Sequence, residues 1–197
     1  TKLDKDGTVI WKIETDILTL DIDKTLLAMI YNNGVIIAYY STTEFSNDDN
    51  LVSSDSIVIL KYDAEGRKLY ELQIPTYNKY KMDVNPSICV DDNNFLYMAI
   101  HSNGWIDGTG LTDFFLFKFV QNESKLNLLW KYHNANINTK LFNRYPTIAL
   151  DKVSNVYIAY ETTGNTPNNT LTGTTDIVIV KLIQSSNSTT PLEPYYV

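Results

Sequence analysis

One short pattern occurs three times in this chain, and its spacing constrains the fold more than any single motif does. Each copy has a polar residue, four apolar residues, a lysine and one more apolar residue; the copies are Ser56–Tyr62, Asp113–Phe119 and Asp176–Leu182. Their lysines are 57 and 63 residues apart. Short apolar runs rich in β-branched and aromatic residues are typical of strands. Self-similarity over such a distance predicts a repeat architecture.

Other markers follow the same period. The aromatic residues Trp11, Tyr70 and Trp130 are 59 and 60 residues apart, and each lies in a strand-like run after a short polar turn. Strand-like runs also surround Ala38, Ala99 and Ala159, and others begin at Thr25, Pro86 and Pro146. A proline is tolerated at the first residue of a strand, which is where we expect these two. No long stretch has a helical apolar period, so we expect almost no helix.

These markers predict an all-β fold made of β-propeller blades, each with four antiparallel strands. One such sheet cannot cover both its faces, whereas sheets packed around an axis cover one another. We expect a single propeller region, 1–197, with about three blades at 16–74, 75–132 and 133–197. Residues 1–15 would end a preceding blade or supply a closing strand. The alternative is a β-sandwich whose spacing is coincidental.

The blade count has a consequence of its own. Propellers close with about four to eight blades, so three are too few for a ring. The chain would therefore be part of a longer propeller, or half of a six-bladed dimer with two-fold symmetry.

Several segments resemble the SBBP-type β-propeller repeat. They are Ser154–Ala159, Asp176–Leu182, Tyr62–Gly66 and Leu126–Trp130. The resemblance covers nearly the whole chain and implies blades, but it implies no single activity and no catalytic residues. The chain departs from the repeat in two ways. Most of the glycines of the repeat are replaced, and Asn122 to Lys125 stand where the repeat has an Asp-x-x-Gly turn.

The lengths of the connections indicate a working face. Connections between second and third strands, and between fourth and first strands, are long, and both kinds emerge on one face of an up-and-down blade. Binding residues are often carried by such loops on a rigid scaffold. We expect this face to hold Trp105, Asp107, His101, Tyr77, Tyr80, His133 and Tyr145, with the carboxylates Asp48, Asp49 and Asp113. Aromatic rings beside carboxylates suit a sugar or a peptide. The alternative is that these loops are simply solvated and that Trp105 packs on a neighbouring blade.

Composition argues against several classes of function. A net charge of −7 disfavours nucleic-acid partners, and no apolar run is long enough for membrane insertion. The one cysteine, Cys89, is expected in the core, with only His101 and His133 available as bases. Asn103–Gly110 lacks the spacing of a calcium loop. We therefore expect no cofactor and no metal.

The leading functional hypothesis is a non-enzymatic scaffold or protein-interaction module. It would be a component of an extracellular surface or a virion, with a protein partner or self-association. The absence of a recognisable nucleophile–base pair argues against an enzyme. One alternative is a carbohydrate-binding propeller that uses the long-loop face for a glycan. Another is a glycoside-type hydrolase with carboxylates around the axis.

Overall fold

The computed structural model describes residues 1–12, 27–41, 56–74, 83–102, 112–122, 124–133, 141–165, 173–183 and 193–196. Within these ranges the chain forms antiparallel sheets, which confirms the predicted all-β class. The same ranges contain no helix that could cross a membrane.

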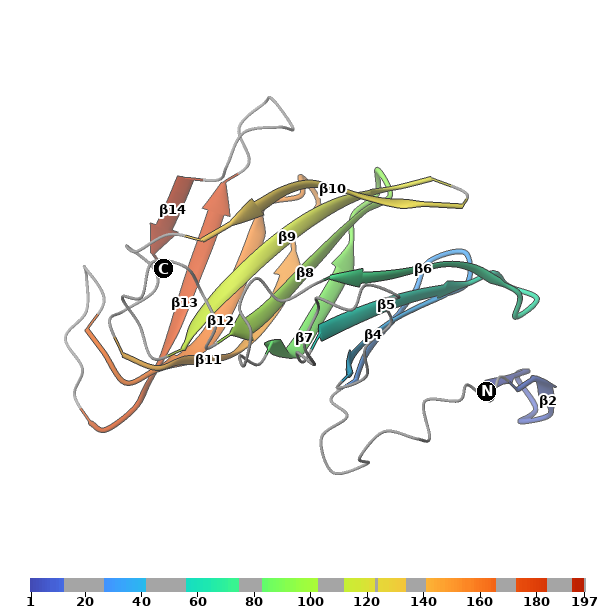
Figure 1. The fold of residues 1–197 in the computed structure, drawn as a ribbon, viewed down its shortest axis with the longest axis horizontal. Helices are drawn as coiled ribbons and strands as arrows, with labels where there is room; N and C mark the ends of the chain where they lie inside the picture. Colours follow the sequence, from blue (N-terminus) through green and yellow to red (C-terminus); the bar gives the residue numbers. More distant parts are fainter. Residues whose placement is uncertain are drawn as a thin grey trace, which may run out of the picture.

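Three of the sheets have four strands each, and in each sheet the strands lie in chain order. The N-terminal hairpin has β1 (Lys2–Leu3) and β2 (Val9–Trp11). The first sheet has β3 (Leu27–Tyr31), β4 (Val35–Ser41), β5 (Ser56–Tyr62) and β6 (Lys68–Ile74). The middle sheet has β7 (Asp83–Val90), β8 (Phe95–Ser102), β9 (Asp113–Gln121) and β10 (Leu126–Tyr132). The last sheet has β11 (Asn143–Leu150), β12 (Val156–Thr162), β13 (Asp176–Ile183) and β14 (Glu193–Tyr196). Figure 1 shows the hairpin and the three sheets following one another across the molecule.

The sheets pack face to face through alternate residues of their third strands. One core cluster joins Ile57 and Ile59 of β5 to Phe115, Phe117 and Phe119 of β9. A second cluster joins Phe114 and Leu116 of β9 to Val178, Val180 and Leu182 of β13. Successive side chains of a strand point to opposite faces, so one strand serves two interfaces. The first strands also lie together, since β7 contacts β3 and β11 contacts β7.

The repeated lysine of each third strand lies opposite an aromatic residue on the fourth. The pairs are Lys61 with Tyr70, Lys118 with Trp130 and Lys181 with Tyr195. In the N-terminal hairpin, Lys2 lies opposite Trp11 in the same way. In the first sheet, Lys61 Nζ donates to Gln121 Oε1 of the middle sheet at 2.8 Å, and the Tyr70 hydroxyl donates to the same oxygen at 3.1 Å. Burial lowers the pKa of Lys61.

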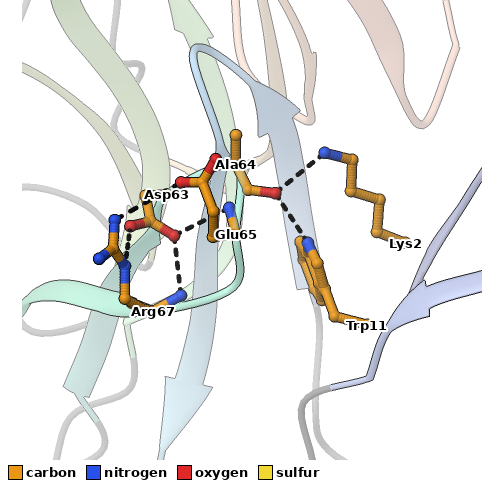
Figure 2. Close-up of polar contacts among 6 residues, drawn as sticks. All are labelled: Lys2, Trp11, Asp63, Ala64, Glu65 and Arg67. Atoms are coloured by element: carbon orange, nitrogen blue, oxygen red, sulfur yellow. Dashed lines mark hydrogen bonds and ion pairs between the residues drawn. The ribbon is translucent and has the colours of Figure 1, made fainter.

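The N-terminal hairpin is attached to the first sheet in a similar way. Lys2 Nζ and Trp11 Nε1 both donate to the backbone oxygen of Ala64 at 2.9 Å, as Figure 2 shows. Ala64 and Gln121 each follow the lysine of their own sheet by three positions. The same kind of contact therefore joins the hairpin to the first sheet and the first sheet to the middle sheet. In each, a lysine and the aromatic residue opposite it donate to one acceptor on the next unit.

The Gln121 contact yields a stability prediction. Gln121→Leu leaves the buried Lys61 ammonium without this acceptor, so we expect the free energy of unfolding to fall by about 2 kcal/mol. Adding Lys61→Met removes the stranded charge and should recover most of that loss. Urea unfolding of the two single variants and the double variant measures the coupling. If the double variant is as unstable as the sum of the single changes, the contact has no energetic role.

Pro86 and Pro146 do not begin their strands, which corrects the expectation from sequence. β7 begins at Asp83 and β11 at Asn143, and the pairing register shifts across each proline. The residues before the prolines, Asn85 and Tyr145, have φ angles of 55° and 53°. A bulge accommodates a proline inside a strand because the ladder is interrupted there.

Four short turns are stabilised in the same manner by an aspartate. Asp4, Asp63, Asp91 and Asp151 each accept the backbone N–H groups of the second and fourth residues that follow. The backbone N–H of Arg67 contributes most to the lowered pKa of Asp63, and Asn155 contributes most to that of Asp151. These turns lie at the end of the sheets opposite the connections between second and third strands.

Candidate functional site

The second and third strands of all three sheets end at the same edge. The last register pairs there are Ser41 with Ser56, Ser102 with Asp113 and Thr162 with Asp176. The connections from second to third strands, and those from fourth to first strands, start and end at this edge, because the strands alternate in direction. We call it the long-connection edge.

A cluster of buried polar side chains lies at this edge, between the middle and last sheets. His133 Nε2 lies 3.1 Å from Asp113 Oδ2, and Asn143 Nδ2 donates to Asp113 Oδ1 at 3.2 Å. The side chains of Asp113 and His133 are only 6% and 11% exposed. The Thr162 hydroxyl donates to Asn143 Oδ1 at 3.0 Å. The carboxylate is therefore held from two sides, with the ring of His133 stacked on Phe115.

The backbone fixes this cluster in place. The Asn143 N–H donates to the oxygen of Thr112 at 2.8 Å, and Thr112 forms an isolated parallel bridge with Phe142. The Phe142 N–H also donates to the Thr163 hydroxyl at 3.1 Å. The beginnings of β9 and β11 are thus joined directly, so Asp113 cannot shift without moving both sheets.

A second set of polar contacts surrounds His101 of β8, made by Tyr145 of β11 and Asn85 of β7. The Tyr145 N–H donates to His101 Nδ1 at 3.3 Å, and Asn85 Nδ2 lies 3.2 Å from the same nitrogen. With Nδ1 accepting, the neutral ring carries its proton on Nε2. Burial, and then the charge of Arg144, lowers the pKa of His101 to about 4. His101 is therefore neutral at physiological pH.

Tyr145 combines exposure with an unusual backbone. Its side chain meets the His101 ring edge-on with centroids 5.4 Å apart, yet the residue is 56% exposed. A positive φ is rare for a bulky residue and costs free energy, and such strain is concentrated at functional sites. The β11 bulge thus presents an aromatic ring to solvent, two residues after Asn143.

The structure brings three of the seven expected site residues to the long-connection edge: His101, His133 and Tyr145. The other four, Trp105, Asp107, Tyr77 and Tyr80, lie outside the described residues. The whole of Asn103–Gly110 also lies outside them, as do Asp48 and Asp49. Asn143 and Thr162 were missed by sequence reasoning. One signal was available for Asn143, because a polar residue stands three positions before both Pro86 and Pro146.

Cysteine chemistry and metal binding gain no support from the described residues. Cys89 is half-buried, and burial, followed by the charge of Asp91, raises its pKa to about 12, so its thiol stays protonated. Among the described side chains, no group of three or more His, Cys, Asp or Glu residues is arranged to hold a metal ion.

Comparisons with known proteins give one kind of match. No family model matches the chain, and no curated protein matches it. Among solved structures, the chain is similar to one described as a thermostable family-43 glycoside hydrolase, with a TM-score of 0.48 and 14% identity. The match covers 86% of this chain and 53% of that one, so the chain spans about half the length of the similar structure.

This finding contradicts two expectations from sequence. The chain was expected to be a non-enzymatic scaffold and not an enzyme, whereas the similar structure is that of an enzyme. The scaffold hypothesis, with its surface or virion role, is not carried further.

Proposed function

We propose that the three four-stranded sheets are propeller blades and that the chain belongs to a carbohydrate-active enzyme of the glycoside-hydrolase type. The reading as blades is supported by the face-to-face packing of successive sheets and by the contacts among β3, β7 and β11. The substrate would bind at the long-connection edge, where the exposed ring of Tyr145 lies beside buried polar groups.

One observation carries this proposal: the buried carboxylate of Asp113, held by His133 and Asn143. Glycoside hydrolysis uses a pair of carboxyl groups whose environments set one as acid and one as base or nucleophile. Asp113 would be one member of the pair, oriented by its two donors.

Activity measurements test the assignment. The intact protein is assayed with aryl α- and β-glycosides and by release of reducing sugar from soluble polysaccharides. We expect Asp113→Asn to lower kcat about a hundredfold with little change in KM, because general acid–base catalysis contributes on this scale.

Asp91→Asn is the matched control, since Asp91 is an aspartate of the same sheet that accepts backbone N–H groups in a turn at the opposite end. It should keep full kcat. Equal activity of Asp113→Asn and Asp91→Asn would contradict the catalytic role of Asp113. Absence of turnover on every substrate would contradict the hydrolase.

A second candidate is carbohydrate binding without hydrolysis, which the exposed, edge-supported ring of Tyr145 favours. Sugars stack on aromatic faces through their apolar C–H surfaces. Tyr145→Ala should weaken binding on a glycan array or in calorimetry about tenfold, whereas Tyr145→Phe should keep it. Binding that depends on Tyr145, with no turnover of the bound glycan, would favour this candidate over the hydrolase.

A further inference from the structure

The second strand of every four-stranded sheet ends in a residue with a hydroxyl group at the long-connection edge. These residues are Ser41 of β4, Ser102 of β8 and Thr162 of β12, and each pairs in register with the first residue of the third strand. Thr162 is only 1% exposed, and it lies at the junction of the middle and last sheets. What its hydroxyl does there is set by its neighbours and not by water.

The neighbours of Asn143 determine which way its side-chain amide points. Asn143 Nδ2 lies 3.2 Å from Asp113 Oδ1, to which it donates. The backbone oxygens of Thr112 and Leu141 are further acceptors for this nitrogen, at 3.3 and 3.4 Å. Asn143 Oδ1 instead accepts from the Thr162 hydroxyl at 3.0 Å. With the amide turned over, its oxygen would face the carboxylate, and two acceptors would lie against each other.

The Thr162 hydroxyl is itself oriented by the backbone. The Gly164 N–H donates to Thr162 Oγ1 at 3.1 Å, which leaves the hydroxyl hydrogen to be donated to an acceptor. Asn143 Oδ1 at 3.0 Å is nearer to Oγ1 than the Gly164 oxygen at 3.3 Å. A series of hydrogen bonds therefore runs from Gly164 through Thr162 and Asn143 to the carboxylate of Asp113.

The two residues that this hydroxyl serves are particular to the junction of the middle and last sheets. Asn143 begins β11, whereas Asp83 begins the equivalent strand β7. Asp113 begins β9, whereas Ser56 begins the equivalent strand β5. An amide that donates to a carboxylate is therefore not a general requirement of the repeated sheet. The fold supplies a hydroxyl in each sheet, and at this junction the hydroxyl fixes the donor of a buried carboxylate.

We propose that Thr162 is a positioning residue for the carboxylate of Asp113, acting through the side-chain amide of Asn143. This inference rests on the proposed hydrolase function, in which Asp113 takes part in the reaction. Thr162 touches no reacting atom; its hydroxyl holds the amide so that Asp113 Oδ1 meets a donor and keeps its direction. Reacting groups must be held within a fraction of an ångström, so loss of this hydroxyl slows the reaction without weakening substrate binding.

Kinetics of single variants test this role. Thr162→Val keeps the shape of the side chain and removes the hydroxyl, so it should lower kcat about tenfold with KM unchanged. Thr162→Ser retains the hydroxyl and should keep kcat within about twofold of the natural chain. Thr147→Val is the matched control, at an exposed threonine of β11, and should keep full kcat. Full kcat in Thr162→Val would overturn the proposal.

A double variant shows whether Thr162 acts through Asn143. Asn143→Ala removes the amide, so adding Thr162→Val should cause no further loss of kcat. Two losses that multiply would show independent roles and would overturn the proposal. Circular dichroism checks that each variant is folded, and Thr162→Ala takes the place of Thr162→Val if the valine chain does not fold.

An NMR measurement separates failure of this inference from failure of the proposed function. The side-chain amide protons of Asn143, assigned by their absence in Asn143→Ala, should exchange slowly with water in the natural chain and faster in Thr162→Val. Unchanged exchange in the folded Thr162→Val chain would overturn the positioning, even where the natural chain hydrolyses glycosides. A natural chain without turnover, in which the exchange does depend on Thr162, would overturn the hydrolase and with it the catalytic purpose of the positioning.

Discussion

Ile57→Ala is expected to lower the free energy of unfolding by about 3 kcal/mol, because it leaves a cavity between two sheets. Ile57 is fully buried and belongs to the cluster that joins the first sheet to the middle sheet. Its loss removes contacts with the phenylalanines of β9, which are fixed by their own sheet and cannot collapse into the space. Urea unfolding followed by tryptophan fluorescence measures the change.

Ile177→Ala is the matched control, because it changes the same residue type at the same position of the repeat. Ile177 is 76% exposed in the single chain, so the same substitution should cost less than about 0.5 kcal/mol. The measurement is made at a protein concentration low enough for the chain to be monomeric. Equal losses at the two positions would contradict the difference in burial between Ile57 and Ile177.

The all-β class could be predicted from sequence because its main signal is periodic. The lysines of the three copies, spaced 57 and 63 residues apart, do occupy the same place on β5, β9 and β13. Each lysine pairs with an aromatic residue on the fourth strand of its sheet. The alternation of side chains within each strand and the distance between copies can both be recognised in a single sequence.

The polar cluster could not be predicted in the same way, because it depends on contacts between sheets. Asp113 and Asn143 are 30 residues apart, and they meet only because β9 and β11 begin at the same edge. Sequence reasoning placed Asp113 and His133 on one face but did not pair them. It also placed Pro146 at the start of a strand, and so missed the bulge that turns Tyr145 outward.

Acidification from pH 7 to about 4 is expected to destabilise the chain by about 3 kcal/mol through His101 alone. In the unfolded chain this ring takes up a proton near its ordinary pKa of about 6.5. In the folded chain its pKa is lowered to about 4 by burial and by Arg144. The unfolded state therefore binds more protons between these values, so stability is complete above about pH 6.5 and falls as the pH drops through this range.

The variant His101→Asn tests this source of acid sensitivity. An asparagine Oδ1 can accept the Tyr145 N–H as Nδ1 does, but it takes up no proton. Free energies of unfolding are measured at intervals between pH 7 and 4.5, a range above the pKa of the turn aspartates Asp63 and Asp151, which is lowered from 3.8. The variant should show a much flatter pH dependence than the natural chain. An unchanged slope would mean that His101 is not the group that couples folding to protons, and that the ring is more open to water than its contacts with Tyr145 and Asn85 imply.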